Sequence, residues 1–336
     1  HAALAGSLQA PPGLFKDLND QIVGDALILN GKQLFIDDHL IEELSGAQKV
    51  LNQPVKHPRN PLLIPEQPWE SIWYDGTSVI YDEEDRIFKR WYLSAKNTDG
   101  VWTSACLYAT SRDGLTWHKP IVNEEAKNNV VFSPNLSGGG FGVFKDPHAT
   151  EPLRRYKMLH SDYPDGTAKT ACTNAAYSPD GIRWTPEPNN PLIPFVDTQS
   201  CPYWDSRRQR YVAYLRFGPP NTRLISRVES KDFVHWSPKV TVIRRTKIDD
   251  PFITNLYGMR ILPYEGLYIG LIDTYHGETI EPIPDENQAW MDKVNIQLAF
   301  SRDGLTWQRV GKHGAIAHAE LSQDNDWKTI ADQATF

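Results

Sequence analysis

Three aspartates stand in settings where a carboxylate could take part in chemistry. Asp75 lies among aromatic residues in IWYDG, Asp146 precedes a proline in FKDPHA, and Asp197 comes just before the run TQSCPYWD. Breaking a glycosidic bond uses one carboxylate that attacks or activates water and a second, kept protonated, that donates to the leaving oxygen. Crowded like charges raise the pKa of one carboxyl at the expense of another, so a single pH can serve both roles.

Further residues could contact a sugar at such a site. The candidate sugar-binding residues are Trp73, Tyr74, His148, Asp250, His276 and Glu320. Trp73 and Tyr74 flank Asp75, and aromatic faces cover the apolar C–H surfaces of sugars, although core packing explains these two residues equally well. No two histidines show HxH or HExxH spacing, so structural histidines are favoured and no metal site is predicted.

A seven-residue motif, called the phrase below, occurs four times along the chain and marks the structural repeats that must position these residues. Its copies are SRDGLTW at 111–117, SPDGIRW at 178–184, SKDFVHW at 230–236 and SRDGLTW at 301–307. In such a turn an Asp or Ser side chain bonds nearby backbone N–H groups, and Gly tolerates a positive φ. The aspartates of the phrase are therefore interpreted as structural, because a residue present in every repeat is explained by the repeat.

The spacing of the closing tryptophans predicts β-propeller blades with variable loops. They are 67, 52 and 71 residues apart, and each phrase follows short runs rich in β-branched and aromatic residues. We expect an all-β protein, a five-bladed β-propeller of four-stranded antiparallel blades. Its inner strands would bring distant carboxylates such as Asp75 and Asp146 together at one axis.

The fifth blade has to come from the two ends of the chain. Residues 34–53 are predicted to form two or three strands, and residues 318–336 a loop that enters another. Joining both ends in one blade would remove exposed edges. We therefore expect residues 1–30 to form an N-terminal extension and residues 31–336 a single propeller, with a last blade closed by N-terminal strands or incomplete through truncation at the C-terminus.

Composition excludes several classes of function. Lys and Arg total 35 against 42 Asp and Glu, so the chain has no basic surplus that would attract nucleic acid or an anionic membrane. No run of about eighteen apolar residues is present, which excludes a membrane-spanning helix of ordinary length. Three cysteines far apart, with no CxxC pair, predict neither a metal knot nor a disulfide framework.

SKDFVHW is similar to the turn-and-Trp phrase that recurs in glycoside hydrolase families 32, 43 and 68, and the blade pattern resembles theirs over roughly residues 60–310. IWYDGTSVIYD resembles their first-blade strand and FKDPHA their second-blade Arg-Asp-Pro element. The resemblance implies that Asp75 is the nucleophile or general base. It implies that Asp146 binds sugar hydroxyls and tunes the other carboxylates.

The third carboxylate of these families has no counterpart in this chain. Family 32 enzymes carry Glu-Cys-Pro in the third blade, whereas Ser200 stands at the Glu position here. Ser cannot act as a general acid, so Asp197, one of Asp249 and Asp250, or Glu320 has to replace it. Position along the chain gives Asp197 an edge.

The resemblance implies a glycoside hydrolase that acts on a carbohydrate, from a chain end or on a small glycoside or furanoside. It implies no required cofactor, room for a structural calcium on the propeller axis, and a secreted or periplasmic location. A carbohydrate-binding propeller without catalysis is the alternative, motivated by Ser200. A sialidase-like propeller is third, since SRDGLTW is similar to the sialidase Asp box but has one residue fewer between Asp and Gly.

Overall fold

The computed structural model describes the chain in segments, and nearly all of its regular structure is β. The described residues are 21–23, 26–28, 32–50, 52, 55, 57–70, 78–98, 101–133, 140–165, 168–218, 222–245, 254–276 and 293–310. Within them the helical elements are two short 3-10 turns, η1 (Pro152–Arg154) and η2 (Ala168–Thr170). The all-β prediction is confirmed.

Four antiparallel sheets follow one another along the chain. Blade 1 contains β3 (Ser78–Asp82), β4 (Ile87–Thr98), β5 (Val101–Ser111), β6 (Trp117–His118) and β7 (Val130–Phe132). Blade 2 contains β8 (Phe141–Lys145), β9 (Tyr156–Asp162), β10 (Cys172–Ser178), β11 (Thr185–Pro186) and β12 (Ile193–Pro194). Blade 3 contains β13 (Ser200–Asp205), β14 (Arg210–Phe217), β15 (Leu224–Ser230) and β16 (Val240–Ile243). Blade 4 contains β17 (Thr254–Tyr264), β18 (Leu267–His276), β19 (Lys293–Ser301) and β20 (Trp307–Arg309).

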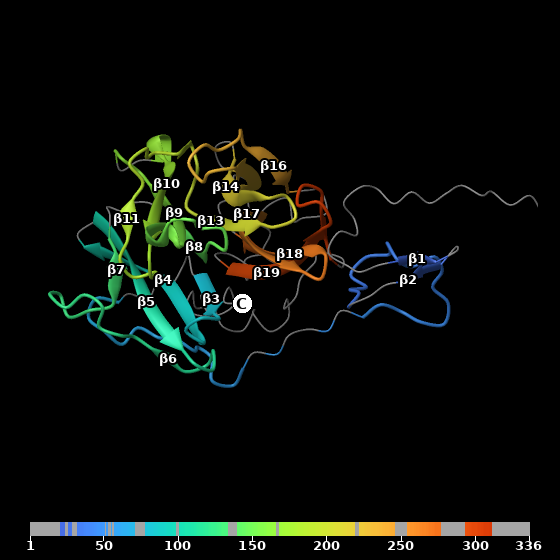
Figure 1. Ribbon diagram of the computed structural model, residues 1–336, viewed down its shortest axis with the longest axis horizontal. Helices are drawn as coiled ribbons and strands as arrows, with labels where there is room; N and C mark the ends of the chain where they lie inside the picture. Colours follow the sequence, from blue (N-terminus) through green and yellow to red (C-terminus); the bar gives the residue numbers. More distant parts are fainter. Residues whose placement is uncertain are drawn as a thin grey trace, which may run out of the picture.

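The blades are arranged as in a propeller. The first strand of each sheet is its inner strand, and β3 contacts β8, β8 contacts β13, and β13 contacts β17. Figure 1 shows the sheets side by side in an arc that runs from blade 1 through blades 2 and 3 to blade 4. A separate small hairpin of β1 (Gln21–Val23) and β2 (Ala26–Ile28) is drawn away from the blades.

The structure differs from the expected fifth blade. Among the described residues of 34–53 there are turns and bends instead of strands. The Asp37 carboxylate accepts a hydrogen bond from the His39 amide at 3.2 Å and forms an ion pair with Arg302 at 2.9 Å. These contacts fold the segment into a turn against blade 4 and leave it no sheet partner. Residues 318–336, the other half of the predicted blade, lie outside the described residues.

The repeated phrase forms the same turn in every blade. In blade 1 the Ser111 hydroxyl accepts a hydrogen bond from the Gly114 amide at 2.9 Å, and the Asp113 carboxylate accepts two from the amides of Leu115 and Thr116 at 2.8 and 2.6 Å. The corresponding bonds recur at 178–183, 230–235 and 301–306. These backbone hydrogen bonds hold the pKa of Asp113 below its ordinary value. The structural interpretation of the four aspartates is confirmed.

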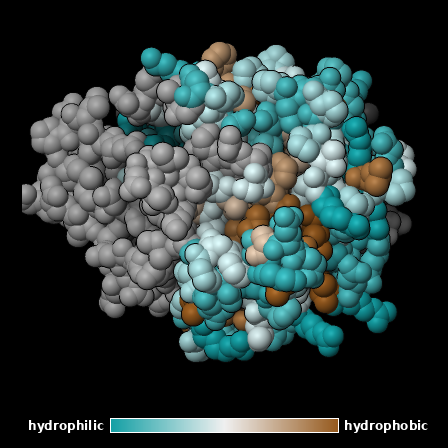
Figure 2. All heavy atoms as spheres, turned by 90° about the vertical axis from the view of Figure 1, so that its left-hand side faces the viewer, coloured by the Kyte–Doolittle hydropathy of each residue, from teal (hydrophilic) through white to brown (hydrophobic). Residues whose placement is uncertain are grey.

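Three hydrophobic clusters join neighbouring blades. One packs Trp91 and Tyr108 of blade 1 against Tyr156 and Met158 of blade 2, and the other two lie in the same way between blades 2 and 3 and between blades 3 and 4. Blades 2 and 3 are therefore covered on both faces. This explains why polar and apolar residues alternate little along their strands. The outer surface on the side of blades 1 and 2 is mainly hydrophilic, with apolar residues gathered near its centre (Figure 2).

Candidate functional site

The structure describes only some of the residues that the sequence singles out. Asp146, Asp197 and His148 are described with their side chains, and His276 is described as the last residue of β18. The remaining candidates lie outside the described residues: Trp73, Tyr74, Asp75, Asp249, Asp250 and Glu320. For these six the sequence prediction stays a prediction.

Asp146 lies in a buried ionic contact at the junction of blades 2 and 3. Its fully buried carboxylate accepts hydrogen bonds from the Lys157 ammonium at 2.6 Å and the Tyr211 hydroxyl at 2.7 Å. It also accepts one from the His148 amide at 2.9 Å. Through Lys157 and Tyr211, Asp146 links the end of β8 to β9 and β14.

The same contact recurs at the other blade junctions. The inner strands of blades 1, 2 and 3 end at or just before an aspartate, and the carboxylate of that aspartate accepts a hydrogen bond from a tyrosine in the second strand of the next blade. The pairs are Asp82 with Tyr156, Asp146 with Tyr211, and Asp205 with Tyr268. Burial and this hydrogen bond raise the pKa of Tyr156 and of Tyr268 to about 12. The turn aspartates are interpreted as structural because they recur from blade to blade. Asp146 recurs in the same way, so it too is interpreted as structural.

Asp146 and Asp197 lie at opposite ends of the inner strands. The Ser161 amide donates to the Gly140 carbonyl, just before β8, and the Ser161 hydroxyl donates to the Thr198 carbonyl at 2.6 Å. Asp146 follows the last residue of β8, and six residues of extended chain span about 20 Å. This placement corrects the expectation that Asp146 shares a site with Asp197.

Close packing of the inner strands fixes the end at which Asp197 lies. Gly140 has a φ of +123°, and a Cβ atom there would overlap the carbonyl oxygen of Thr198. Only glycine allows this backbone conformation at such a short approach. The chain before β8 is thereby held directly beside the residues that lead into β13.

Asp197 lies at this end, and so does Asp162 at the end of β9, whose carboxylate accepts a hydrogen bond from the Asn174 amide group at 3.2 Å. The Asp197 carboxylate forms an ion pair with the Arg216 guanidinium at 2.8 Å and accepts hydrogen bonds from the Tyr163 hydroxyl at 2.8 Å and the Thr198 amide at 2.7 Å. The Asp197 side chain is 37% exposed, whereas the Arg216 side chain is 4% exposed. The carboxylate is therefore fixed from behind and open to a ligand in front.

The charge state of Asp197 follows from these contacts. Burial favours the neutral form, but the Arg216 charge and the hydrogen bonds outweigh it and hold the pKa of Asp197 below its ordinary value. An ionised carboxylate cannot donate a proton at neutral pH. These contacts suit Asp197 to accept hydrogen bonds or to stabilise positive charge better than to replace the missing general acid.

Aromatic and basic side chains surround Arg216. Its guanidinium lies 4.2 Å from the centre of the Tyr257 ring, and Arg223 lies 5.3 Å from the same ring. The Tyr257 and Tyr275 rings are 5.2 Å apart. Sequence reasoning missed this group, because its members come from β14, β17, β18 and the residue before β15, and they share no motif.

Ser200 and His148 have structural surroundings. Ser200 is buried, and its hydroxyl donates to the Leu159 carbonyl at 3.1 Å, so no carboxyl group takes its place there. The His148 ring packs on Trp204, with the ring centres 4.3 Å apart, and its backbone amide binds Asp146. His148 therefore lies with Asp146, which corrects its assignment to a shared site with Asp197.

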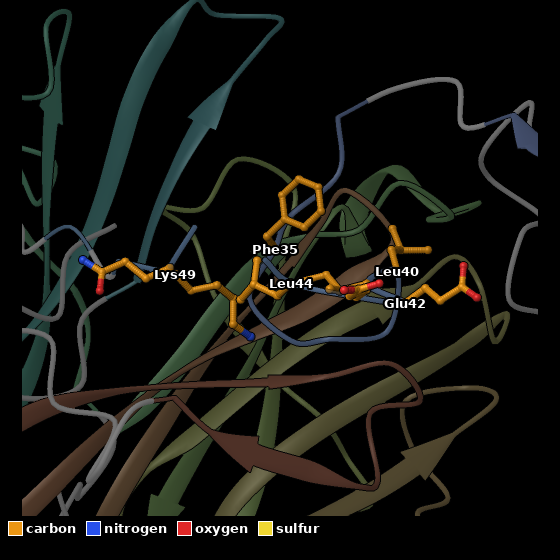
Figure 3. Close-up of a pocket in the computed structure, with 8 residues that line it drawn as sticks. Phe35, Leu40, Glu42, Leu44 and Lys49 are labelled. Atoms are coloured by element: carbon orange, nitrogen blue, oxygen red, sulfur yellow. The ribbon is translucent and has the colours of Figure 1, made fainter. Parts of the chain in front are cut away.

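A hollow of about 980 Å³ lies in a different part of the molecule. It is lined by Phe35, Leu40, Ile41, Glu42, Glu43, Leu44, Gln48 and Lys49, which all belong to residues 32–50 (Figure 3). No inner-strand residue lines it, so it is separate from the Asp197 site. Over the described residues, no group of three or more His, Cys, Asp or Glu could hold a metal ion.

Within the described ranges, no helix has the length and apolar character needed to cross a bilayer.

Comparison with known proteins found similarity in structure and none in sequence. No family model and no curated protein matches the chain. A candidate glycosidase from Bacteroides thetaiotaomicron is 16% identical with a TM-score of 0.54, and the match covers 80% of this chain and 84% of that one. A candidate glycoside hydrolase from Bacteroides ovatus is 14% identical with a TM-score of 0.54 over 80% of this chain and 83% of that one. A family 32 β-fructofuranosidase from Bombyx mori is 13% identical with a TM-score of 0.49. The match covers 74% of this chain but only 52% of that one, so the chain spans about half the length of this protein.

At these identities the two Bacteroides structures show the fold. They confirm that this chain has the β-propeller architecture found in proteins described as glycosidases. The chemistry has to be inferred from the residues of the chain itself.

Proposed function

We propose that this protein is a glycoside hydrolase whose active site lies where the inner strands begin. The observation that carries the proposal is the position of Asp197, a half-exposed carboxylate three residues before β13. Asp75 stands three residues before β3, and Asp250 stands four residues before β17. Because corresponding positions in successive blades repeat around the axis, all three are expected at one end of the propeller.

The roles of the carboxylates follow from charge. Asp197 is held ionised by Arg216, so it accepts hydrogen bonds from sugar hydroxyls and stabilises the positive charge that develops on the ring. We assign the attacking or water-activating role to Asp75. The proton donor is then Asp249 or Asp250, since an acid next to two ionised carboxylates has a raised pKa.

The substrate is proposed to be a furanoside or another small glycoside, cleaved from a chain end. A propeller funnel is a pocket with a closed base, which favours terminal residues of a glycan over internal ones. No cofactor is required for this reaction, because both proton transfers use carboxyl groups.

A carbohydrate-binding propeller without catalysis is the second candidate. It is favoured by Ser200, which stands at the position of the third-blade acid and uses its hydroxyl within the core. Under this alternative Asp197, held in place by Arg216, would bind sugar hydroxyls, and no turnover would follow.

Hydrolysis of a panel of fructofuranosides, arabinofuranosides and pyranosides tests the proposal. We expect turnover of at least one class, and a loss of at least about 100-fold in kcat for Asp75→Asn with an unchanged Tm. Glu124→Gln is the control, because Glu124 is an exposed residue that pairs only with the exposed Lys127 among the described residues. Full activity in Asp75→Asn would remove its assigned role, and binding without turnover of any substrate would support the second candidate.

A further inference from the structure

Phe195 combines an exposed aromatic ring with an unfavourable backbone conformation. Its φ is +56°, and the residue is 65% exposed. Six non-glycine residues have positive φ in the described part of the chain, and the other five lie in turns that reverse the chain. A bulky residue seldom adopts this conformation, and such outliers gather at ligand sites.

The surrounding chain holds Phe195 in this conformation. Its amide donates to the Ala171 carbonyl at 2.7 Å, and the Lys239 ammonium donates to the Phe195 and Pro194 carbonyls at 3.2 and 2.6 Å. The same ammonium lies 4.4 Å from the centre of the Phe217 ring. A half-buried lysine thus fixes the turn, and its ammonium also lies 5.9 Å from the centre of the Phe195 ring, while the residue stays largely exposed.

Phe195 lies at the same end of the propeller as Asp197. The two residues are separated only by Val196, so their Cα atoms are at most about 7 Å apart. Phe217 directly follows Arg216, the ion-pair partner of Asp197. The backbone of Phe195 is therefore close enough to Asp197 for both residues to contact one oligosaccharide.

We propose that Phe195 is a stacking platform for a second sugar residue of the substrate, next to the residue bound at Asp197. The ligand class is an oligosaccharide of at least two units with an apolar C–H face. This inference rests on the location given to the active site in the proposed function. It explains why a large aromatic residue, instead of glycine, occupies a position with positive φ outside a chain reversal.

Calorimetric titration with mono- to tetrasaccharides of the fructan, arabinan, xylan and glucan series tests the platform. The variants are Phe195→Ala, Phe195→Trp and Phe195→Gly, with Phe35→Ala as the control, since Phe35 is 62% exposed on a separate segment. Covering one ring face buries about 60 Å² of apolar surface, which corresponds to roughly a tenfold change in Kd. We expect Phe195→Ala to weaken oligosaccharide binding about tenfold and monosaccharide binding hardly at all, with Phe195→Trp close to the parent.

Phe195→Gly separates a ligand-binding role from a structural one. Glycine adopts positive φ readily, so this variant should keep or raise the Tm while losing the same affinity. A lower Tm with unchanged oligosaccharide binding would overturn the proposal.

The outcomes distinguish the platform from the proposed hydrolase. Length-dependent binding that Phe195→Ala leaves unchanged contradicts the platform alone. Binding that depends on Phe195 without any hydrolysis supports the platform and contradicts the hydrolase. Parent protein that binds no sugar of the panel contradicts both.

Discussion

The Asp146→Asn substitution separates the structural role of Asp146 from the catalytic role that its sequence setting suggests. In the structure the substitution removes a charge that is fully buried against the Lys157 ammonium at 2.6 Å. It leaves a buried lysine without its counter-ion, a change that costs about 3–5 kcal/mol in proteins. The asparagine side chain can still accept the Tyr211 hydrogen bond, so we expect the lower value, about 3 kcal/mol.

This loss converts into a measurable shift in melting temperature. An unfolding entropy of about 2.1 cal/mol/K per residue over roughly 300 residues gives a fall in Tm of about 5 °C. Tyr211→Phe removes a single hydrogen bond to a carboxylate and should cost about 1.5 kcal/mol, or about 2 °C. Tyr268→Phe should behave in the same way, because it removes the equivalent bond at the junction of blades 3 and 4. Tyr156→Phe should cost more, because the Tyr156 hydroxyl also accepts a hydrogen bond from the Lys89 ammonium at 2.9 Å.

The assay is thermal unfolding of the four variants, with hydrolysis measured at 25 °C, well below their Tm. We expect the activity of folded Asp146→Asn to remain within a few-fold of the parent. A variant with unchanged Tm and abolished hydrolysis would refute the structural role and return Asp146 to the catalytic site.

Two further predictions concern ionisation. Arg216→Met should raise the pKa of Asp197 towards its ordinary value, and so shift the acidic limb of the kcat/KM profile to higher pH. An unmoved limb would show that Asp197 does not govern it. Burial lowers the pKa of His160 to about 4 from an ordinary value of 6.5, so between these pH values the unfolded chain binds a proton that the folded chain does not. Stability should therefore fall by about 3 kcal/mol as pH is lowered through this window, and urea unfolding of His160→Leu should show a flatter dependence than the parent; equal slopes would contradict this origin.

Much of the fold could be predicted because its signals are local and repeated. Turn chemistry at Ser111, Asp113 and Gly114 needs only side chains and amides a few residues apart, so the phrase is visible in the sequence. Strands such as β14 (Arg210–Phe217) coincide with runs of β-branched and aromatic residues. The segment 34–53 shows the limit, since it contacts blade 4 through a long-range ion pair from Asp37 to Arg302 that no local pattern in the sequence reveals.

The site was predicted less well, for a physical reason. A short motif such as FKDPHA does not tell which end of a strand presents the aspartate, and β8 places Asp146 at the end opposite Asp197. A second repeated pattern could have corrected this. It pairs an aspartate at the end of an inner strand, in blades 1 to 3, with a tyrosine in the next blade. It is weak in sequence because Asp82 and Tyr156 are far apart along the chain and meet only across the blade junction.

A crystal structure of Asp75→Asn soaked with an oligosaccharide that the parent protein cleaves tests the central claim most directly. We expect the sugar at the end of the propeller where β8 and β13 begin, with a hydroxyl within hydrogen-bonding distance of the Asp197 carboxylate. A sugar bound beside Asp146, or in the hollow formed by residues 35–49, would contradict the account.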